Sequence, residues 1–279
     1  LRTGKYTHLR SSEYDPYSLS DNAIYSFCKD REDGIWIGSY FGGVNYYPRS
    51  YTHFEKYYPK GEENSLHGKR VREFCRDNYG VLWIGTEDGG LNRFNLNTKE
   101  FSFFAPSAGF TNIHGLCLVD DKLWVGTFSK GLKIIDTRTG TVLKTYQKNS
   151  SPRSLIDNSI FAICRTATGD IYLGTMFGLV KYNKQSDDFD RIPELNGKFV
   201  YDIKEDSGGN IWLATYANGA YCYNVNDRKW KNYVHDEKDT TSLSYNKVSS
   251  IFEDSYHRIW LTPQGGCLLY TSDAADDLT

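Results

Sequence analysis

An all-β fold, a β-propeller of four-stranded antiparallel blades, is predicted by three features of this 279-residue sequence. Aromatic residues make up 15% of the chain, a bias that suits pleated strands, whose rings pack across neighbouring strands. A short anchor, in which a Trp or Tyr stands between apolar residues, recurs six times, and consecutive anchors are 40 to 48 residues apart. A period of this length, with several short strands in each unit, is typical of propeller blades. The sequence therefore predicts about six blade-equivalents.

The six anchors define the second strand of each blade. Each aromatic ring is expected to fill the space between blades, and the Gly that follows two positions later in four of the six anchors is expected to let neighbouring backbones approach closely. The residues that we predict to be structural in this way are Trp36 in IWIGS, Trp83 in LWIGT, Trp124 in LWVGT, Tyr172 in IYLGT, Trp212 in IWLAT and Trp260 in IWLTP.

Four strands are expected in each repeat, as the first complete repeat illustrates. Residues 23–30 form the first strand, and the turn after it carries an Asp that can cap N–H groups and a Gly that accepts positive φ. Residues 35–39, 44–48 and 51–57 form the second, third and fourth strands. Because one such sheet cannot bury both of its faces, neighbouring blades must cover them.

The ends of the chain predict its domain limits. Residues 4–10 (GKYTHLR) match residues 50–56 (SYTHFEK), so the chain is expected to begin with the outer strand of a split blade. Five complete blades and a partial sixth blade follow, so that the propeller spans 1–270. Both a closed ring and an arc cut from a larger array fit this pattern. Residues 271–279 depart from it and are expected to be disordered or foreign to the native gene.

The six cysteines follow the repeat rather than a disulfide pattern. Four of them stand seven or eight residues before the aromatic residue of their anchor, so they are copies of one structural position. Copies in neighbouring blades should stand farther apart than the roughly 7 Å that a disulfide can bridge. We therefore expect free, mostly buried thiols at Cys28, Cys75, Cys117, Cys164, Cys222 and Cys267.

Three longer segments carry a resemblance to a known repeat. They are SLSDNAIYSFCKDREDGIWIGS (18–39), SLIDNSIFAICRTATGDIYLGT (154–175) and SLSYNKVSSIFEDSYHRIWLTP (242–263). These segments resemble the two-component regulator propeller repeat, and with the other anchors the resemblance covers 4–270. The chain departs from the family pattern at Thr166, Tyr172, Ala214 and Thr262.

The resemblance implies a function that the residues alone do not. It implies a ligand-sensing propeller in the periplasmic sensor region of a hybrid two-component system histidine kinase of Bacteroidetes. Such receptors respond to glycan-derived oligosaccharides and regulate polysaccharide-utilisation genes. A homodimer formed through the sensor region, and attachment to the membrane only through segments downstream of this chain, are implied as well. The kinase is not part of this chain, so no catalysis is expected in it.

Several other functions find little support in the sequence. It contains no GxSxG, HExxH, glycine-rich phosphate loop or CxxC, so no catalytic residue, metal site or cofactor is predicted. The net charge of −2 and the scattered basic residues give no support for nucleic-acid binding. No apolar run approaches the roughly 20 residues that a membrane helix needs. The alternatives left open are a propeller glycoside hydrolase or lyase and a protein-interaction or dimerisation scaffold.

A ligand site is expected where the turns between the second and third strands meet the links between blades, since both emerge on one rim. Aromatic rings suit sugar faces, and amides and charges suit hydroxyl groups. Packing of blades, a spacer role or a dimer surface would explain the same rim residues. The candidate residues are Tyr40, Phe41, Arg70, Glu87, Asp88, His114, Phe128, Met176, Phe177, Tyr216 and Asn218, with Asn22, Lys69, Asn112, Asn158 and Asn246 added by the links.

Overall fold

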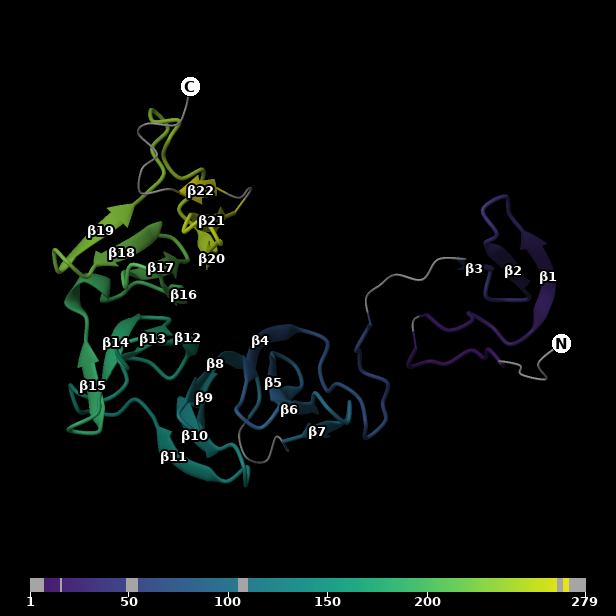
Figure 1. Ribbon diagram of the computed structural model, residues 1–279, viewed down its shortest axis with the longest axis horizontal. Coiled ribbons are helices and arrows are strands. Elements are labelled where there is room, and N and C mark those ends of the chain that lie inside the picture. The colour runs from purple at the N-terminus through teal and green to yellow at the C-terminus, as the bar shows by residue number, and fades with distance from the viewer. Residues whose placement is uncertain (1–7, 16, 49–54, 105–109, 265–267, 271–279) are drawn as a thin grey trace. The chain divides into compact units, whose positions relative to one another are not determined.

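The computed structural model describes residues 8–15, 17–48, 55–104, 110–264 and 268–270. The described chain consists of antiparallel β-sheets and one short 3₁₀ helix, η2 (Pro193–Leu195). The all-β fold with four-stranded blades is thereby confirmed. The chain divides into two compact units, Leu1–Leu66 and His67–Thr279, which are described separately below (Figure 1).

Unit 1 contains one three-stranded sheet. Its strands are β1 (Ile24–Lys29), β2 (Ile35–Ser39) and β3 (Val44–Tyr47), paired in that order. Most of the predicted outer strands of this region, at 4–10 and 51–57, lies outside the described residues.

Unit 2 contains five sheets, of which four have four strands and the last has three. In each sheet the strands pair in chain order. The first sheet is β4 (Val71–Arg76), β5 (Val81–Thr86), β6 (Gly90–Asn95) and β7 (Phe101–Phe103); the second is β8 (Ile113–Val119), β9 (Lys122–Thr127), β10 (Leu132–Asp136) and β11 (Val142–Tyr146). The third is β12 (Ile160–Arg165), β13 (Ile171–Thr175), β14 (Gly178–Asn183) and β15 (Asp188–Arg191); the fourth is β16 (Val200–Glu205), β17 (Ile211–Thr215), β18 (Ala220–Asn224) and β19 (Lys229–Tyr233). The fifth is β20 (Val248–Glu253), β21 (Ile259–Pro263) and β22 (Leu268–Tyr270).

The first strands of these sheets lie closest to a common axis. Strand β4 contacts β8, β8 contacts β12, β12 contacts β16 and β16 contacts β20. Figure 1 shows the sheets of unit 2 following one another along a curve, with the fourth strands on the outside. The blades of unit 2 are therefore stacked radially, as the repeat predicted.

The recurring Asp, turn and Trp form one hydrogen-bonded unit. The indole N–H of Trp83 donates to Asp77 Oδ2 at 2.9 Å, while Asp77 Oδ1 accepts the backbone N–H groups of Tyr79 and Val81. A single carboxylate thus caps the turn and orients the ring that follows it. The same indole–carboxylate bond joins Trp36 to Asp30, Trp212 to Asp206 and Trp260 to Asp254, at 2.8 to 3.0 Å.

Two blades depart from this unit in ways that the bond explains. Tyr172 replaces the Trp in the blade where Thr166 replaces the Asp, and the Thr166 hydroxyl accepts the Asp170 N–H instead. A Tyr ring has no N–H to offer, so the carboxylate is not needed there. Before Trp124 the turn is shortened to Asp120 and Asp121, and Asp120 adopts a positive φ of 56°.

The small residue after the anchor makes room for the next blade. A Cβ on Gly85, Gly126 or Gly174 would lie 2.6, 2.8 or 2.7 Å from a methyl group of Ile113, Ile160 or Val200. Each of these β-branched residues begins the inner strand of the following blade. The Gly therefore allows the close approach that the sequence predicted, and a small, buried Ala214 occupies the equivalent position beside Val248.

Burial of the anchor rings differs between the two units. Trp83, Trp124 and Trp212 are buried, and Tyr172 and Trp260 are half-buried. Trp36 is 44% exposed, because the single sheet of unit 1 covers only one side of it. Its predicted burial between two blades stays a prediction.

The described cysteines are free thiols. Each of Cys28, Cys75, Cys117 and Cys164 lies opposite the anchor aromatic residue on the neighbouring strand. Their burial is less complete than expected, since only Cys222 is fully buried and Cys28 is exposed. The remaining cysteine, at 267, lies outside the described residues.

Candidate functional site

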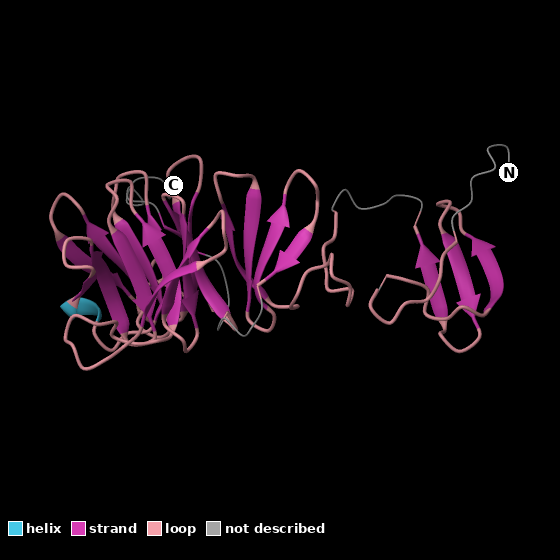
Figure 2. Ribbon diagram, turned by 90° about the horizontal axis from the view of Figure 1, so that it is seen from below, coloured by secondary structure: helices cyan, strands magenta, loops and turns pink. Residues whose placement is uncertain are grey.

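In unit 2 the loops gather at two opposite edges of the sheets (Figure 2), and the turns between second and third strands are joined to the links between blades by backbone hydrogen bonds. The residue after each second strand donates its N–H to a carbonyl of the preceding link. Glu87 donates to Arg70, Phe128 to Asn112 and Tyr216 to Phe199, at 2.9 to 3.0 Å. These bonds hold the two predicted sets of residues together as one rim.

A β-bulge directs one side chain of every inner strand toward this rim. The pairing of each inner strand with its neighbour shifts register directly after the first residue of the strand. A bulge leaves its extra residue unpaired and re-aims the side chain. The residues at this position in the first four blades of unit 2 are Arg72, His114, Phe161 and Tyr201.

Six aromatic side chains gather at the rim, and we call them the rim cluster. His114 and Phe161 have ring centroids 4.5 Å apart, and Phe161 and Phe199 have centroids 4.4 Å apart. Phe199 stacks on Tyr216 at 5.4 Å with an angle of 18° between the ring planes. The full cluster is His114, Phe128, Phe161, Phe199, Tyr201 and Tyr216, which come from three consecutive blades.

Two cations complete the cluster. The guanidinium of Arg72 lies 4.7 Å from the centroid of Tyr201, and the ammonium of Lys247 lies 4.5 Å from the centroid of Tyr216. Arg72 also pairs with Glu87 at 3.8 Å. Arg72 belongs to β4 and Tyr201 to β16, three blades farther along, so the inner strands converge enough for side chains to meet across the axis.

His114 offers an unused hydrogen-bond acceptor within the cluster. Its Nε2 lies 2.7 Å from Asn112 Oδ1, an acceptor, so Nε2 carries the proton. Its Nδ1 is buried and has no partner among the described residues. Burial and the nearby Arg72 guanidinium lower the pKa of His114 to about 4. The ring is therefore neutral at physiological pH, and Nδ1 can accept a hydrogen bond from a hydroxyl group.

A pair of carboxyl groups lies next to the rim on the inner strands. Glu73 follows the bulge in β4, and Asp202 follows the bulge in β16. Burial and the Asp202 carboxylate raise the pKa of Glu73 to about 7, although Lys204 and Arg72 oppose this shift. Asp202 accepts hydrogen bonds from the Ser250 hydroxyl and from the Ile251 N–H at 3.0 to 3.1 Å.

Stability is expected to depend on the ionisation of Glu73. Its pKa is higher in the folded than in the unfolded chain, so its stabilising contribution is complete below about pH 4.5 and is lost as the pH rises through about 7. Glu73→Gln should raise the free energy of unfolding at pH 8 by about 1–2 kcal/mol and leave it unchanged near pH 4.5. Urea denaturation at both pH values measures this, with the exposed Glu237→Gln as control. Equal effects of the two variants at pH 8 would contradict the assignment.

The structure brings only some of the predicted site residues together. His114, Phe128 and Tyr216 belong to the rim cluster, and Glu87 reaches it through Arg72. Tyr40 and Phe41 lie in unit 1. There the ring of Tyr40 contacts Phe41 at 4.2 Å and Tyr25, which occupies the bulge position of β1, at 4.9 Å.

Other predicted residues have their polar groups committed to the backbone. The Asp88 carboxylate accepts the N–H groups of Lys69 and Arg70 at 2.9 to 3.1 Å, and these bonds lower its pKa. The Arg70 side chain itself is exposed. The amide oxygens of the link asparagines Asn22, Asn158 and Asn246 accept backbone N–H groups of Ser11, Lys148 and His235.

Three predicted residues stay at the rim without joining the cluster. The backbone N–H of Met176 donates to Ser159, and that of Asn218 donates to the Thr215 hydroxyl. Phe177 is 52% exposed. Within the described part of the chain, no ring contact connects Phe177 with the rim cluster.

Five residues of this site were missed by sequence reasoning: Arg72, Phe161, Phe199, Tyr201 and Lys247. Three of them directly follow the first apolar residue of an inner strand, in the pairs VR, IF and VY. When the repeats are aligned, the position after the first apolar residue of each inner strand can be recognised, and an aromatic or charged residue recurs there. The bulge that directs these side chains toward the rim has no recognisable pattern of residues in the sequence.

The described residues show no group of three or more His, Cys, Asp or Glu side chains placed to hold a metal ion. They include no helix with the length and hydrophobicity needed to cross a membrane.

Comparison with known proteins shows which sequences and structures this chain is similar to. Residues 18–41, 65–88 and 194–217 match the sequence profile of the family described as two component regulator propeller. Histidine kinase P4 of Formosa agariphila is 25% identical over 151 residues, which are 54% of this chain and 8% of that protein.

Two solved structures show the same fold at lower identity. The extracellular domain of the hybrid two component system BT3049 of B. thetaiotaomicron has a TM-score of 0.63 and 23% identity, covering 93% of this chain and 35% of that one. Virginiamycin B lyase of Staphylococcus aureus has a TM-score of 0.56 and 11% identity, covering 91% of this chain and 83% of that one. This chain thus spans only a small part of the kinase and about a third of the extracellular domain. Three segments of this chain thus match the two component regulator propeller family, and the chain has the fold of the extracellular domain of such a system.

Proposed function

We propose that this chain is a ligand-sensing propeller of a hybrid two-component sensor and that its rim cluster binds a glycan-derived oligosaccharide. The observation that carries the proposal is the stacked pair Phe199 and Tyr216 in the same rim cluster as the unpaired Nδ1 of His114. The C–H faces of sugar rings pack against aromatic rings, and sugar hydroxyls need hydrogen-bond partners at fixed positions. The rim cluster contains both kinds of group, connected through Phe161.

The relatives support a sensor rather than a free-standing binding protein. One is a histidine kinase, and one is an extracellular domain of a hybrid two component system. We therefore propose a periplasmic location, with membrane attachment, the kinase and the control of polysaccharide-utilisation genes supplied by other parts of a longer protein. A homodimer formed through the sensor region belongs to the same proposal, and sedimentation of the isolated chain tests it.

The carboxylates at the rim favour binding over catalysis. Glu87 is paired with Arg72, and Asp88 is held by two backbone N–H groups. Neither is placed as a free general acid or base, which a propeller hydrolase would need, so the pair Glu73 and Asp202 next to the rim is left as the one that an enzyme could use. Incubating the chain with oligosaccharides and analysing the products by mass spectrometry tests this: cleavage would argue for the enzyme instead.

The binding proposal predicts a saccharide-dependent thermal shift that needs the rim. A panel of oligosaccharides is screened by differential scanning fluorimetry, and the double variant Phe128→Ala, Tyr216→Ala should lose the shift. Both side chains are only partly buried, at 39% and 45% exposure, so their removal should leave the fold intact. Tyr256→Ala is the matched control, because Tyr256 is 76% exposed and lies on a turn between first and second strands, at the opposite edge.

The outcomes separate the alternatives. Loss of the shift in the double variant with retention in Tyr256→Ala would support the rim site. An unchanged shift in the double variant would remove the saccharide from this rim.

A further inference from the structure

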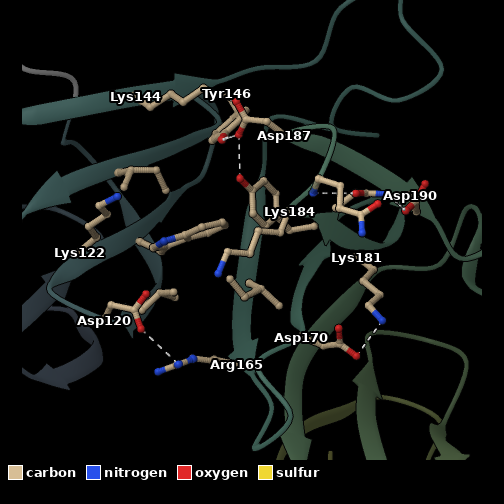
Figure 3. Close-up of a pocket in the computed structure, with 18 of the residues that line it drawn as sticks. Asp120, Lys122, Lys144, Tyr146, Arg165, Asp170, Lys181, Lys184, Asp187 and Asp190 are labelled. Atoms are coloured by element: carbon tan, nitrogen blue, oxygen red, sulfur yellow. Dashed lines mark hydrogen bonds and ion pairs between the residues drawn. The ribbon is translucent and has the colours of Figure 1, made fainter.

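We propose a second binding site in unit 2, for a small solute that carries an oxyanion, in a cavity between the second and third sheets. The cavity has a volume of about 970 Å³ (Figure 3). Its walls come from β9, β10 and β11 on one side and from β13, β14 and neighbouring turns on the other. It opens near turns between first and second strands, at the edge opposite the rim cluster. The proposal does not depend on saccharide binding at the rim.

The cavity lies where the Asp-bearing turn is missing. In the third sheet, five residues connect β12 to β13, whereas only Asp120 and Asp121 connect β8 to β9. The position six residues before Trp124 is Leu118, so no carboxylate meets the indole as Asp77 meets that of Trp83. At this shortened turn Trp124 lines the cavity between the two blades.

Trp124 supplies a hydrogen-bond donor without an acceptor. The residue is 5% exposed and lines the cavity. In the described residues, no acceptor lies within hydrogen-bonding distance of its indole nitrogen, whereas the other four anchor indoles each have an Asp. The indole N–H is accessible from the cavity rather than sealed within the protein, so it is free to donate to a bound molecule. A bound acceptor would satisfy it.

The carboxylates that line the cavity are already neutralised. Asp120 pairs with Arg165 at 3.3 Å, Asp170 with Lys181 at 2.7 Å and Asp190 with Arg153 at 2.9 Å. Asp187 binds the ammonium of Lys144 and accepts the hydroxyl groups of Tyr146 and Tyr182. Figure 3 shows several of these pairs around the cavity.

Two lysine side chains that line the cavity are not paired with any carboxylate of the described residues. Lys122, at the start of β9, and Lys184, in the turn between β14 and β15, have no carboxylate partner in the part of the chain that the structure describes. With the Trp124 N–H, the lining of this one cavity includes three hydrogen-bond donors. Three donors, two of them charged, complement the oxygens of a carboxylate, sulfate or phosphate. The volume is that of a drug-sized or sugar-sized ligand, larger than an inorganic ion alone needs.

The test follows the indole N–H resonances of the ¹⁵N-labelled chain during titration at constant ionic strength. The probes are glucuronate, glucose 6-sulfate and glucose 6-phosphate, with neutral glucose as the uncharged counterpart. We expect the Trp124 signal, assigned through Trp124→Phe, to shift saturably with at least one anionic probe and not with glucose. The anionic probe that binds with the highest affinity shows whether the site prefers a carboxylate, a sulfate or a phosphate.

Three variants locate the site. Trp124→Phe keeps an aromatic ring at this position and removes the N–H, which should weaken binding about tenfold, the effect of one charge-assisted hydrogen bond. Its binding is followed by isothermal calorimetry. Lys122→Gln and Lys184→Gln should each weaken binding by a similar factor, whereas Lys130→Gln, at the opposite edge, should not. Phe128→Ala with Tyr216→Ala should leave this binding intact.

Either of two results would overturn the proposal. One is a Trp124 resonance that none of the three anions moves. The other is binding that glucose reproduces and that the Lys122 and Lys184 variants leave unchanged.

Discussion

Trp83→Ala is expected to lower the free energy of unfolding by about 3–5 kcal/mol, the range for truncation of a large buried aromatic side chain. Trp83 is fully buried and contacts Phe104 at 5.5 Å and the Arg93 guanidinium at 5.1 Å. Its loss would leave a cavity between blades and would deprive the buried Asp77 carboxylate of its indole donor. Chemical denaturation followed by circular dichroism measures the effect.

Trp36→Ala is the matched control for this prediction. It removes the same side chain and the same bond to an Asp, but Trp36 is 44% exposed. We expect a clearly smaller loss of stability. Equal losses for the two variants would mean that Trp36 is buried as well, against a second sheet that unit 1 does not supply.

Gly126→Val is expected to destabilise the chain by about 3 kcal/mol through overpacking between two blades. A Cβ at Gly126 would lie 2.8 Å from Ile160 Cγ2 and 3.2 Å from the Ile160 carbonyl oxygen. Ile160 is fully buried, so neither it nor its backbone can move aside cheaply. Thermal and urea denaturation measure the loss.

A double-mutant cycle tests the mechanism behind that loss. Gly126→Ala combined with Ile160→Val recreates the pair that Ala214 and Val248 form between the fourth and fifth sheets. The double variant should be more stable than the sum of the two single effects predicts, because the shorter side chain leaves room for the methyl group. Strict additivity would show that the two residues do not compete for the same space.

The candidate site was only partly accessible to sequence reasoning. His114, Phe128 and Tyr216 were found because rim positions follow from strand order. Phe161 and Tyr201 were missed because a bulge, rather than strand alternation, decides where they point. Asp88 was expected to meet a ligand, but its carboxylate binds the link backbone, and a carboxylate looks the same in sequence whichever donors it meets.

The sequence by itself determined the repeating blade, since its strands and turns depend on neighbours that lie close along the chain. The sequence also shows the Asp six residues before the Trp in four of the six anchors, and both residues are replaced in the blade of Thr166 and Tyr172. Only the tertiary structure decided which blades meet. Arg72 lies against Tyr201, and Trp124 faces a cavity, because radial packing brings together side chains from different repeats. Such contacts depend on the curvature of the whole stack, and no local pattern of residues encodes it.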